Sequence, residues 1–350
     1  MISGQTISRR MAFAVLALCI VTAGLARAED KGTIYYLIPT LLDEGQIEAQ
    51  KAIEKVLPSI GYNVVSLDAR NRTDLQLSQL DDVIQRKPKA IILNAVDLDA
   101  VVPAIEKARG AGIPVVVFDR QVTGTPVDLS SVAGTVEIGR IAADEAARLL
   151  KTRYGSIKGD VLQILGDPGD KYTLDIQKGF EEAMKQYPDV KITSEAAAQW
   201  DADKAREIAD DKLLANPKID LIFVHAAHLA VPVVAVLQSK GKKPGDVMLI
   251  SSNGAPAGLK LIREGWEQVE VEKPTYAQVY GLAMLLDKVI AKEPLQPGDY
   301  NVLNLPAKLT LEKWGPSLTI PGAAITAGNV NDSRFWGNLS PPAVPVEVVK

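Results

Sequence analysis

The feature that most constrains the fold is a regular alternation of short apolar segments with amphipathic segments along most of the chain. The apolar segments predict strands at residues 32–38, 63–67, 90–93, 114–118, 160–165, 190–194, 221–224, 247–251 and 268–271. The amphipathic segments predict helices at residues 46–56, 75–86, 101–109, 138–150, 174–186, 203–215, 231–239 and 258–263. Strands that are apolar on both faces are typical of parallel sheets covered by helices on both sides. The pattern therefore predicts an α/β fold with doubly wound parallel sheets.

The number of strand and helix units exceeds what one compact core accommodates, and the series begins again with the same rhythm near residue 134. This restart predicts two similar lobes. In open α/β sheets ligands bind at the carboxyl ends of the strands, so we expect a ligand between the lobes.

The first 28 residues are typical of a secretory signal peptide. Arg9 and Arg10 precede an apolar stretch at residues 11–24, and residues 26–28 read Ala-Arg-Ala, a small-x-small cleavage signal. We expect the mature chain to begin near Glu29. An uncleaved anchor and export by the twin-arginine route are the minor alternatives, because the apolar stretch is shorter than the roughly 20 residues that span a bilayer.

Cleavage at this position would remove the single cysteine, Cys19, so we expect no disulfide and no thiolate metal site in the mature chain. Lipidation of Cys19 is a weaker alternative. Removal of residues 1–28 takes away three arginines and no acidic residue, which changes the net charge from −4 to −7. An acidic chain of this kind gives no electrostatic reason to bind nucleic acid or an anionic membrane surface.

Residues 111–120, with the sequence Ala-Gly-Ile-Pro-Val-Val-Val-Phe-Asp-Arg, place Asp119 and Arg120 together at the carboxyl end of a buried strand. A carboxylate accepts hydrogen bonds from hydroxyl groups, and a guanidinium donates to their oxygens. The pair therefore indicates recognition of neighbouring hydroxyls on a sugar or polyol. The alternative interpretation is a surface ion pair.

The chain resembles the periplasmic sugar-binding proteins of ABC transporters, the ribose-binding-like group that shares its fold with the ligand domains of LacI-type repressors. The resemblance extends from about residue 33 to residue 275. It is carried by segments 61–69 (GYNVVSLDA), 90–101 (AIILNAVDLDAV), 111–120 (AGIPVVVFDR), 179–184 (GFEEAM) and 200–205 (WDADKA). Each segment alone is a weak signal, and together they are specific.

The resemblance implies two lobes joined by a three-segment hinge, the type I arrangement of periplasmic binding proteins. We expect the crossovers near residues 133–135, 273–275 and 301–305. The N-terminal lobe would then comprise residues 29–133 and 276–302, and the C-terminal lobe residues 134–273 and 303–339. We expect residues 340–350 to form a disordered tail.

The resemblance also implies which residues line the ligand site. Asn94, Asp119 and Arg120 match polar sugar contacts of the family, and Trp200 falls where the family places an aromatic ring against the sugar. The remaining candidates fall at or beside other pocket positions and are Asp43, Gln46, Tyr172, His225, Asn253 and Glu272. An aromatic face suits the apolar C–H patch of a sugar, and planar polar groups suit its hydroxyl rim.

The chain departs from the family pattern mainly in the second lobe. Ile176 stands where relatives carry an arginine, residues 226–227 are Ala-Ala in place of Asn-Asp, and residues 252–253 are Ser-Asn in place of Phe-Asp. In the first lobe, residues 43–46 replace a phenylalanine pair. These differences indicate a ligand related to ribose but altered. Loss of a cation beside several carboxylates favours a neutral pentose, hexose or polyol over an anion.

Signals for enzyme chemistry are few. The sequence contains no nucleophile elbow, zinc-protease helix, phosphate loop or dinucleotide fingerprint. Asp43 and Glu272 could in principle serve as a glycosidase pair. The two histidines, His225 and His228, lack neighbouring ligands at metal-binding spacing, so we expect neither a metal nor a cofactor.

The sequence therefore predicts a periplasmic solute-binding protein, not an enzyme, that captures a neutral sugar or polyol and delivers it to an ABC permease in the inner membrane. We expect it to act as a monomer. The alternatives are a periplasmic sensor of a small polar signal that is coupled to a membrane receptor, and a secreted carbohydrate-active enzyme.

Overall fold

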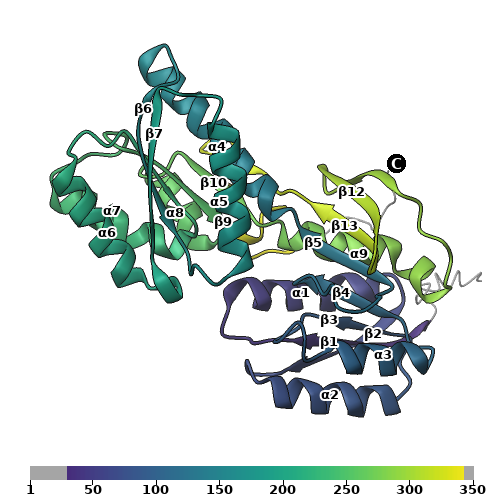
Figure 1. Ribbon diagram of the computed structural model, residues 1–350. Helices are drawn as coiled ribbons and strands as arrows, with labels where there is room; N and C mark the ends of the chain where they lie inside the picture. Colours follow the sequence, from purple (N-terminus) through teal and green to yellow (C-terminus); the bar gives the residue numbers. More distant parts are fainter. Residues whose placement is uncertain (1–29, 343–350) are drawn as a thin grey trace, which may run out of the picture.

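The computed structural model describes residues 30–342, which form two α/β lobes, each built around one sheet (Figure 1). The predicted signal peptide and residues 343–350 of the predicted tail lie outside the described residues. No helix in the described range is both long and apolar enough to cross a membrane.

The first lobe contains a sheet with the strand order β11-β12-β13-β5-β4-β3-β1-β2. Its strands are β1 (Gly32–Ile38), β2 (Tyr62–Asp68), β3 (Ala90–Leu93), β4 (Val115–Asp119), β5 (Leu129–Ala133), β11 (Gly298–Val302), β12 (Leu305–Glu312) and β13 (Gly315–Ile320). The helices of this lobe are α1 (Glu44–Ser59), α2 (Thr73–Gln85), α3 (Val102–Gly110) and α9 (Thr275–Ile290). Strands β1 to β5 pair in parallel, as their apolar character on both faces predicts.

The second lobe contains a sheet with the strand order β14-β10-β9-β8-β6-β7. Its strands are β6 (Gly159–Leu165), β7 (Val190–Ala196), β8 (Leu221–Val224), β9 (Met248–Asn253), β10 (Val269–Glu272) and β14 (Ala324–Ile325). Its helices are α4 (Thr135–Tyr154), α5 (Lys171–Met184), α6 (Ala202–Ala215), α7 (Ala227–Ser239) and α8 (Pro256–Arg263), with short 3₁₀ turns η1 (Ala198–Trp200) and η2 (Trp336–Asn338). The predicted fold class is thereby confirmed.

Helices cover both faces of each sheet (Figure 1). In the first lobe, α1 and α9 pack on the face that carries Ile34 and Tyr36, and α2 and α3 pack on the face that carries Leu37. In the second lobe, α4 and α5 cover one face, and α6 and α7 cover the other. Each lobe therefore has its own apolar core on both sides of its sheet.

Helices α4 and α5 cross with their backbones in contact because two glycines meet at the crossing. A Cβ atom added at Gly139 would lie 2.1 Å from the carbonyl oxygen of Ile176. A Cβ atom added at Gly179 would lie 1.9 Å from the carbonyl oxygen of Val136. This close packing fixes the start of α5, the helix that carries Tyr172, relative to the first crossover.

The chain passes between the lobes after β5, after β10 and after β13. The first two passages lie at the expected positions, but the third does not lie at residues 301–305. That segment is a tight β11–β12 turn, in which Leu303 and Asn304 adopt φ values of 52° and 64°, as two-residue hairpin turns require. Strands β12 and β13 therefore stay in the first sheet, and the chain crosses to the second lobe between β13 and β14.

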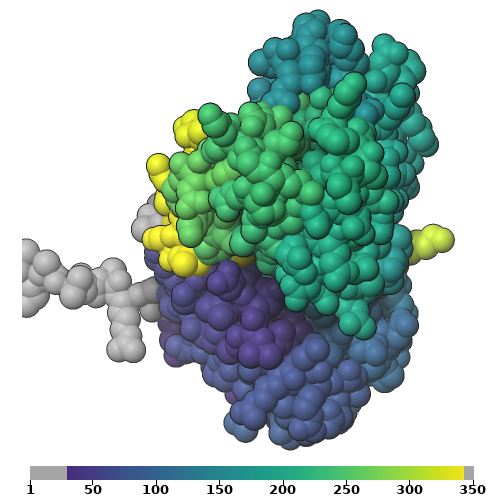
Figure 2. Space-filling model, turned by 90° about the vertical axis from the view of Figure 1, so that its left-hand side faces the viewer, coloured from purple at the N-terminus to yellow at the C-terminus, as the bar shows by residue number. Residues whose placement is uncertain are grey.

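In Figure 2 the first lobe, in purple and blue, meets the second lobe, in teal and green, along a boundary that crosses the molecule. The residues predicted for the ligand site lie at the carboxyl ends of β1, β3 and β4 and of β6 to β10, or in the segments that follow these strands.

Candidate functional site

Asp119 is the centre of a hydrogen-bonded cluster at the edge of the first sheet. It is the last residue of β4 and adopts a positive φ of 66°, which turns the chain sharply as it leaves the sheet. Its Oδ2 atom accepts hydrogen bonds from Gln46 Nε2 at 3.0 Å and Asn94 Nδ2 at 3.3 Å. Asn94 Nδ2 also donates to Gln46 Oε1 at 2.9 Å. Three of the predicted site residues are thus brought together.

The second crossover adds a residue that the sequence analysis did not select. Lys273 follows β10, and its Nζ atom lies 2.5 Å from Asp119 Oδ1. The Asp119 side chain is only 5% exposed and that of Lys273 is 22% exposed, so the pair is largely removed from water. Lys273 Nζ also lies 5.9 Å from the centre of the Tyr172 ring in the second lobe. Lys273 therefore connects the two sides of the site.

The electrostatic environment keeps Asp119 ionised. Burial raises the pKa of its carboxyl group, but the charges of Lys273 and Arg120 and the hydrogen bonds from Lys273 and Gln46 outweigh burial. The net result is a pKa below the ordinary value for aspartate. The Asp119–Lys273 pair therefore carries no net charge.

The second lobe contributes an aromatic wall. The rings of Tyr172 and Trp200 lie 6.1 Å apart at an interplanar angle of 50°. Asp170, the N-cap of α5, accepts a hydrogen bond from Trp200 Nε1 at 3.3 Å. The Trp200 ring lies directly on Gly166 at the end of β6, where an added Cβ atom would lie 2.1 Å from the ring. Only glycine permits this position of the tryptophan.

His225 is fully buried one residue after β8. Its Nε2 atom lies 2.9 Å from Gln163 Nε2, while Gln163 Oε1 accepts a hydrogen bond from Ser194. This arrangement assigns the Gln163 amide as donor to His225 Nε2 and places the ring proton on Nδ1. Burial lowers the pKa of His225 to about 3, so the imidazole is neutral at physiological pH.

Several buried polar atoms in this region have no hydrogen-bond partner within the described residues. They include Asn94 Oδ1 in the first lobe and the Tyr172 hydroxyl and His225 Nδ1 in the second lobe. Buried polar atoms are normally hydrogen-bonded, so atoms of this kind are expected where a polar ligand binds. Asn94 Oδ1 is an acceptor, His225 Nδ1 is a donor, and the Tyr172 hydroxyl can act as either.

The other predicted residues have different roles. Asp43 caps α1, and its Oδ1 atom accepts a hydrogen bond from the main chain of Gln46 at 2.9 Å. Arg120 is exposed, and its guanidinium donates to the carbonyl oxygen of Ala95 at 3.2 Å. Asn253 ends β9 with a strained φ of 105°.

Glu272 is buried but is directed away from the Asp119 cluster. Its Oε1 atom accepts a hydrogen bond from the main chain of Trp336 at 3.3 Å, and it lines a separate cavity of about 130 Å³ beside Arg334. Burial raises the pKa of this carboxyl group well above its ordinary range. Asp43 and Glu272 therefore do not form a carboxylate pair in one site.

The described residues contain no group of three or more potential metal-ligating side chains suited to holding a metal ion. The site is instead an arrangement of amides, one ion pair and aromatic rings, which can bind a ligand rich in hydroxyl groups.

Comparison with known proteins agrees with this architecture. The family model for the periplasmic binding protein domain matches residues 34–294. The chain belongs to this family. Membership implies that this periplasmic binding protein functions in the periplasm, and it confirms the resemblance noted from the sequence.

Relatives of this periplasmic binding protein include import binding proteins for ribose and for D-apiose. The ribose import binding protein RbsB of Salmonella typhimurium is 28% identical over 82% of this chain and 95% of its own length. The D-apiose import binding protein of Actinobacillus succinogenes is 27% identical over 69% of this chain and 76% of its own length. Both of these relatives are named as binding proteins.

Solved structures of ABC transporter solute-binding proteins share the fold. One from Bacillus halodurans with bound myo-inositol has a TM-score of 0.68 at 20% identity, covering 88% of this chain and 99% of its own. One from Actinobacillus succinogenes with bound D-allose has a TM-score of 0.68 at 22% identity, covering 86% of this chain and 100% of its own.

Proposed function

We propose that this chain is the solute-binding component of an ABC importer and that it captures a neutral sugar or polyol between its lobes for delivery to a permease in the inner membrane. The observation that carries the proposal is the cluster of Gln46, Asn94 and Asp119 on one lobe, joined through Lys273 to the aromatic wall of the other lobe. The names of the relatives point to the same class of ligand.

The charges of the site support a neutral ligand. Asp119 and Lys273 neutralise each other at 2.5 Å, so neither requires an opposite charge on the ligand. Three unpartnered atoms are available to the ligand: Asn94 Oδ1 accepts hydrogen bonds, His225 Nδ1 donates one, and the Tyr172 hydroxyl can do both. Hydroxyl groups both donate and accept, so a polyhydroxylated ligand satisfies all three kinds of atom.

The aromatic wall supports a sugar or cyclic polyol over a linear polar metabolite. Tyr172 and Trp200 form a tilted pair beside the ion pair. Aromatic rings of this kind stack against the apolar C–H face of a sugar. A ligand that contacts both lobes shifts the equilibrium between open and closed states toward the closed state, which the permease then recognises.

No catalytic step is part of the proposal. Asp43 caps a helix and Glu272 is bonded to Trp336, so these two carboxyl groups are not placed on either side of a common substrate. We further propose that the chain is exported with a cleaved signal peptide ending at residue 28 and acts as a monomer. Nothing in the site favours the sensor alternative over import.

The proposal is tested by thermal-shift measurements on the chain from residue 29 onward. Pentoses, hexoses, polyols and their acidic derivatives are screened, and the bound compound is recovered by denaturation and identified by mass spectrometry. Ligand at about 100 times its Kd adds about 2.7 kcal/mol, which raises the Tm of a chain this long by roughly 5 °C. We expect one neutral compound to do so and to be recovered unchanged. A response to acidic sugars alone, or recovery of a hydrolysed product, would contradict the proposal.

A further inference from the structure

A second set of contacts between the lobes lies outside the cleft, in residues 323–342. This segment, which we call the tail strap, follows the third crossover and lies beyond the residues that match the family model. In Figure 2 it is yellow and lies at the boundary between the lobes.

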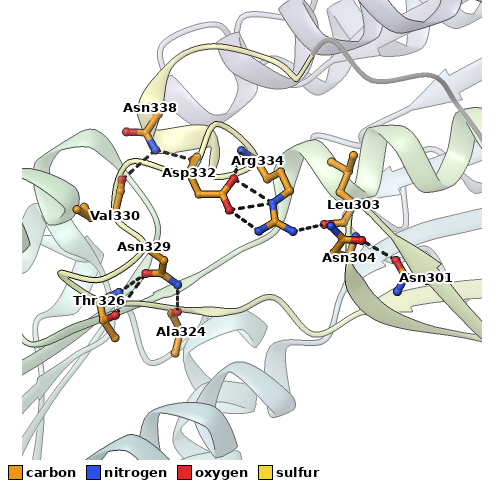
Figure 3. A network of polar contacts seen from close by, with 10 residues as sticks. All are labelled: Asn301, Leu303, Asn304, Ala324, Thr326, Asn329, Val330, Asp332, Arg334 and Asn338. Atoms are coloured by element: carbon orange, nitrogen blue, oxygen red, sulfur yellow. Dashed lines mark hydrogen bonds and ion pairs between the residues drawn. The ribbon is translucent and has the colours of Figure 1, made fainter.

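The tail strap begins on the second lobe. Strand β14 pairs antiparallel with β10, and Ile325, Val330 and Phe335 pack against Leu259 and Ile262 of α8. Hydrogen bonds from Asn329 and Asn338 to main-chain oxygens hold its turns in place (Figure 3). This part of the strap belongs to the second lobe.

The tail strap then contacts the first lobe. Arg334 is oriented by an ion pair with Asp332 and donates from Nη1 to the carbonyl oxygen of Leu303, in the β11–β12 turn, at 3.1 Å (Figure 3). Further along, Lys55 Nζ of α1 donates to the carbonyl oxygen of Pro341 at 2.5 Å. The hydroxyl of Tyr280 in α9 donates to the carbonyl oxygen of Pro342. Residues 340–342, predicted as part of a disordered tail, are therefore held on the first lobe.

Trp336 lies between the two ends of the strap and contacts both halves of the ligand site, at the end of β9 in the second lobe and at the start of α1 in the first lobe. Its side chain is 1% exposed, and Nε1 donates to the main-chain oxygen of Asn253 at 2.8 Å. A Cβ atom added at Gly45, the residue before Gln46, would lie 3.9 Å from the six-membered part of its ring. Trp336 thus connects the strained end of β9 with the start of the helix that holds Asp119 through Gln46.

We infer that the tail strap is a fourth connection between the lobes and that Trp336 is a positioning residue, which couples the two halves of the cleft and favours the closed arrangement. The inference rests on the proposed function for its ligand-binding consequence. In the structure that contains the strap contacts, Asn94 Oδ1 on the first lobe and the Tyr172 hydroxyl on the second lobe are both buried. A ligand that bonds to both lobes requires these two atoms to be buried at the same time. Contacts that are made in one state and lost in the other stabilise the first state.

The strap meets the first lobe through one buried ring and a few polar contacts. Trp336 packs in the apolar core that also contains residues of α1 and α9. The polar contacts are those of Arg334, Lys55 and Tyr280, and a cavity of about 130 Å³ beside Arg334 interrupts the packing between the strap and the β11–β12 turn. The ring of Trp336 is therefore the main apolar contact by which the strap can couple the lobes.

The test measures the distance between the lobes by pulsed electron resonance. Spin labels are placed at Asp82→Cys on α2 and Glu182→Cys on α5, both exposed, in the chain from residue 29, which has no other cysteine. The variants are Trp336→Ala and the double change Lys55→Met with Tyr280→Phe. Phe335→Leu is the matched control, because the buried apolar cluster that contains Phe335 is built on α8 of the second lobe.

Without ligand, we expect both strap variants to show longer and broader inter-lobe distances than the wild type. For the sugar that gives the largest thermal shift, we expect affinity to fall about 10-fold, within the usual range of coupling between sites. Phe335→Leu should lower Tm and leave distances and affinity unchanged. Distance distributions that match the wild type, together with affinities within twofold of it, in both strap variants would overturn the inference. If Trp336→Ala does not fold, the distances and affinity of the variant that combines Lys55→Met and Tyr280→Phe decide whether the inference holds. The ligand-free distances test the strap even if no sugar binds.

Discussion

The Nζ atom of Lys273 lies 2.5 Å from Oδ1 of Asp119, so an ion pair joins the second crossover to the carboxyl end of β4. Lys273 lies in a segment that connects the lobes, so we expect its position to change when the lobes rotate. Asp119 in turn orients Gln46 and Asn94. The ion pair therefore links lobe closure to the polar groups that would meet a sugar.

Replacement of Asp119 tests the centre of this cluster. Asp119→Asn keeps a side chain that tolerates positive φ but removes the charge that pairs with Lys273. We expect ligand affinity to fall by about 100-fold or more, since the change removes the charged acceptor that orients Gln46 and Asn94, and hydrogen bonds to charged groups contribute about 1.5–3 kcal/mol each. Calorimetric titration measures the loss, with circular dichroism as the control for folding. Unchanged affinity in a folded variant would remove Asp119 from the site.

Replacement of Lys273 should change how stability depends on pH. In the wild type the pKa of Asp119 is lowered, so its stabilising contribution is present above about pH 4 and is lost as pH falls below that value through the folded pKa. In Lys273→Met, the charge and hydrogen bond that offset the burial of Asp119 are lost, so the pKa of Asp119 rises. We expect the variant to lose more stability relative to the wild type at pH 7 than at pH 4, as measured by urea unfolding. An equal loss at both pH values would contradict the electrostatic role of Lys273.

The two histidines provide a matched pair for a second pH experiment. The pKa of buried His225 is lowered to about 3, whereas an unfolded histidine titrates near 6.5. As pH falls from about 6.5 toward 3, only the unfolded chain gains this proton, so the free energy of unfolding decreases. His225→Gln should reduce the stability difference between pH 7 and pH 4 by about 3 kcal/mol. His228→Gln, at an exposed position, is the control. If both changes reduced the stability difference between pH 7 and pH 4 by the same amount, burial of His225 would not be the cause of that difference.

Gly166 tests the position of the aromatic wall. In Gly166→Ala the new methyl group would overlap the Trp200 ring, at 2.1 Å, and displace it from Tyr172. We expect about a 10-fold loss of ligand affinity, comparable to losing an aromatic contact of about 1.5 kcal/mol. Gly110→Ala is the control, since a methyl group at Gly110 meets no atom within 4 Å. Retention of full affinity in Gly166→Ala would mean that Trp200 does not contact the ligand.

The sequence predicts the parts of the molecule that depend on local patterns. Strands such as β3 are apolar on both faces, which predicts parallel sheets between helices. The meeting of Asn94 and Asp119 also follows from the pattern, because both residues end parallel strands of one sheet and such ends share an edge.

The remaining features depend on packing between distant segments. The family resemblance predicts the third crossover at residues 301–305, where the structure has the β11–β12 turn. Leucine at positive φ, as in Leu303, is a weak sequence signal for such a turn. Glu272 and Lys273 are adjacent, yet one is bonded to the tail strap and the other to Asp119. Successive side chains of a strand point to opposite faces, so whether Glu272 or Lys273 reaches the cleft depends on the residue at which β10 ends.

The most direct test of the account is a crystal structure of the chain with the neutral sugar that stabilises it most. We predict that the sugar lies between the lobes, with hydroxyl groups at hydrogen-bond distance from Asn94 Oδ1 and the Tyr172 hydroxyl and its C–H face near Trp200. A sugar bound elsewhere, for example in the cavity beside Glu272 and Arg334, with the Asp119 cluster unoccupied, would contradict the account.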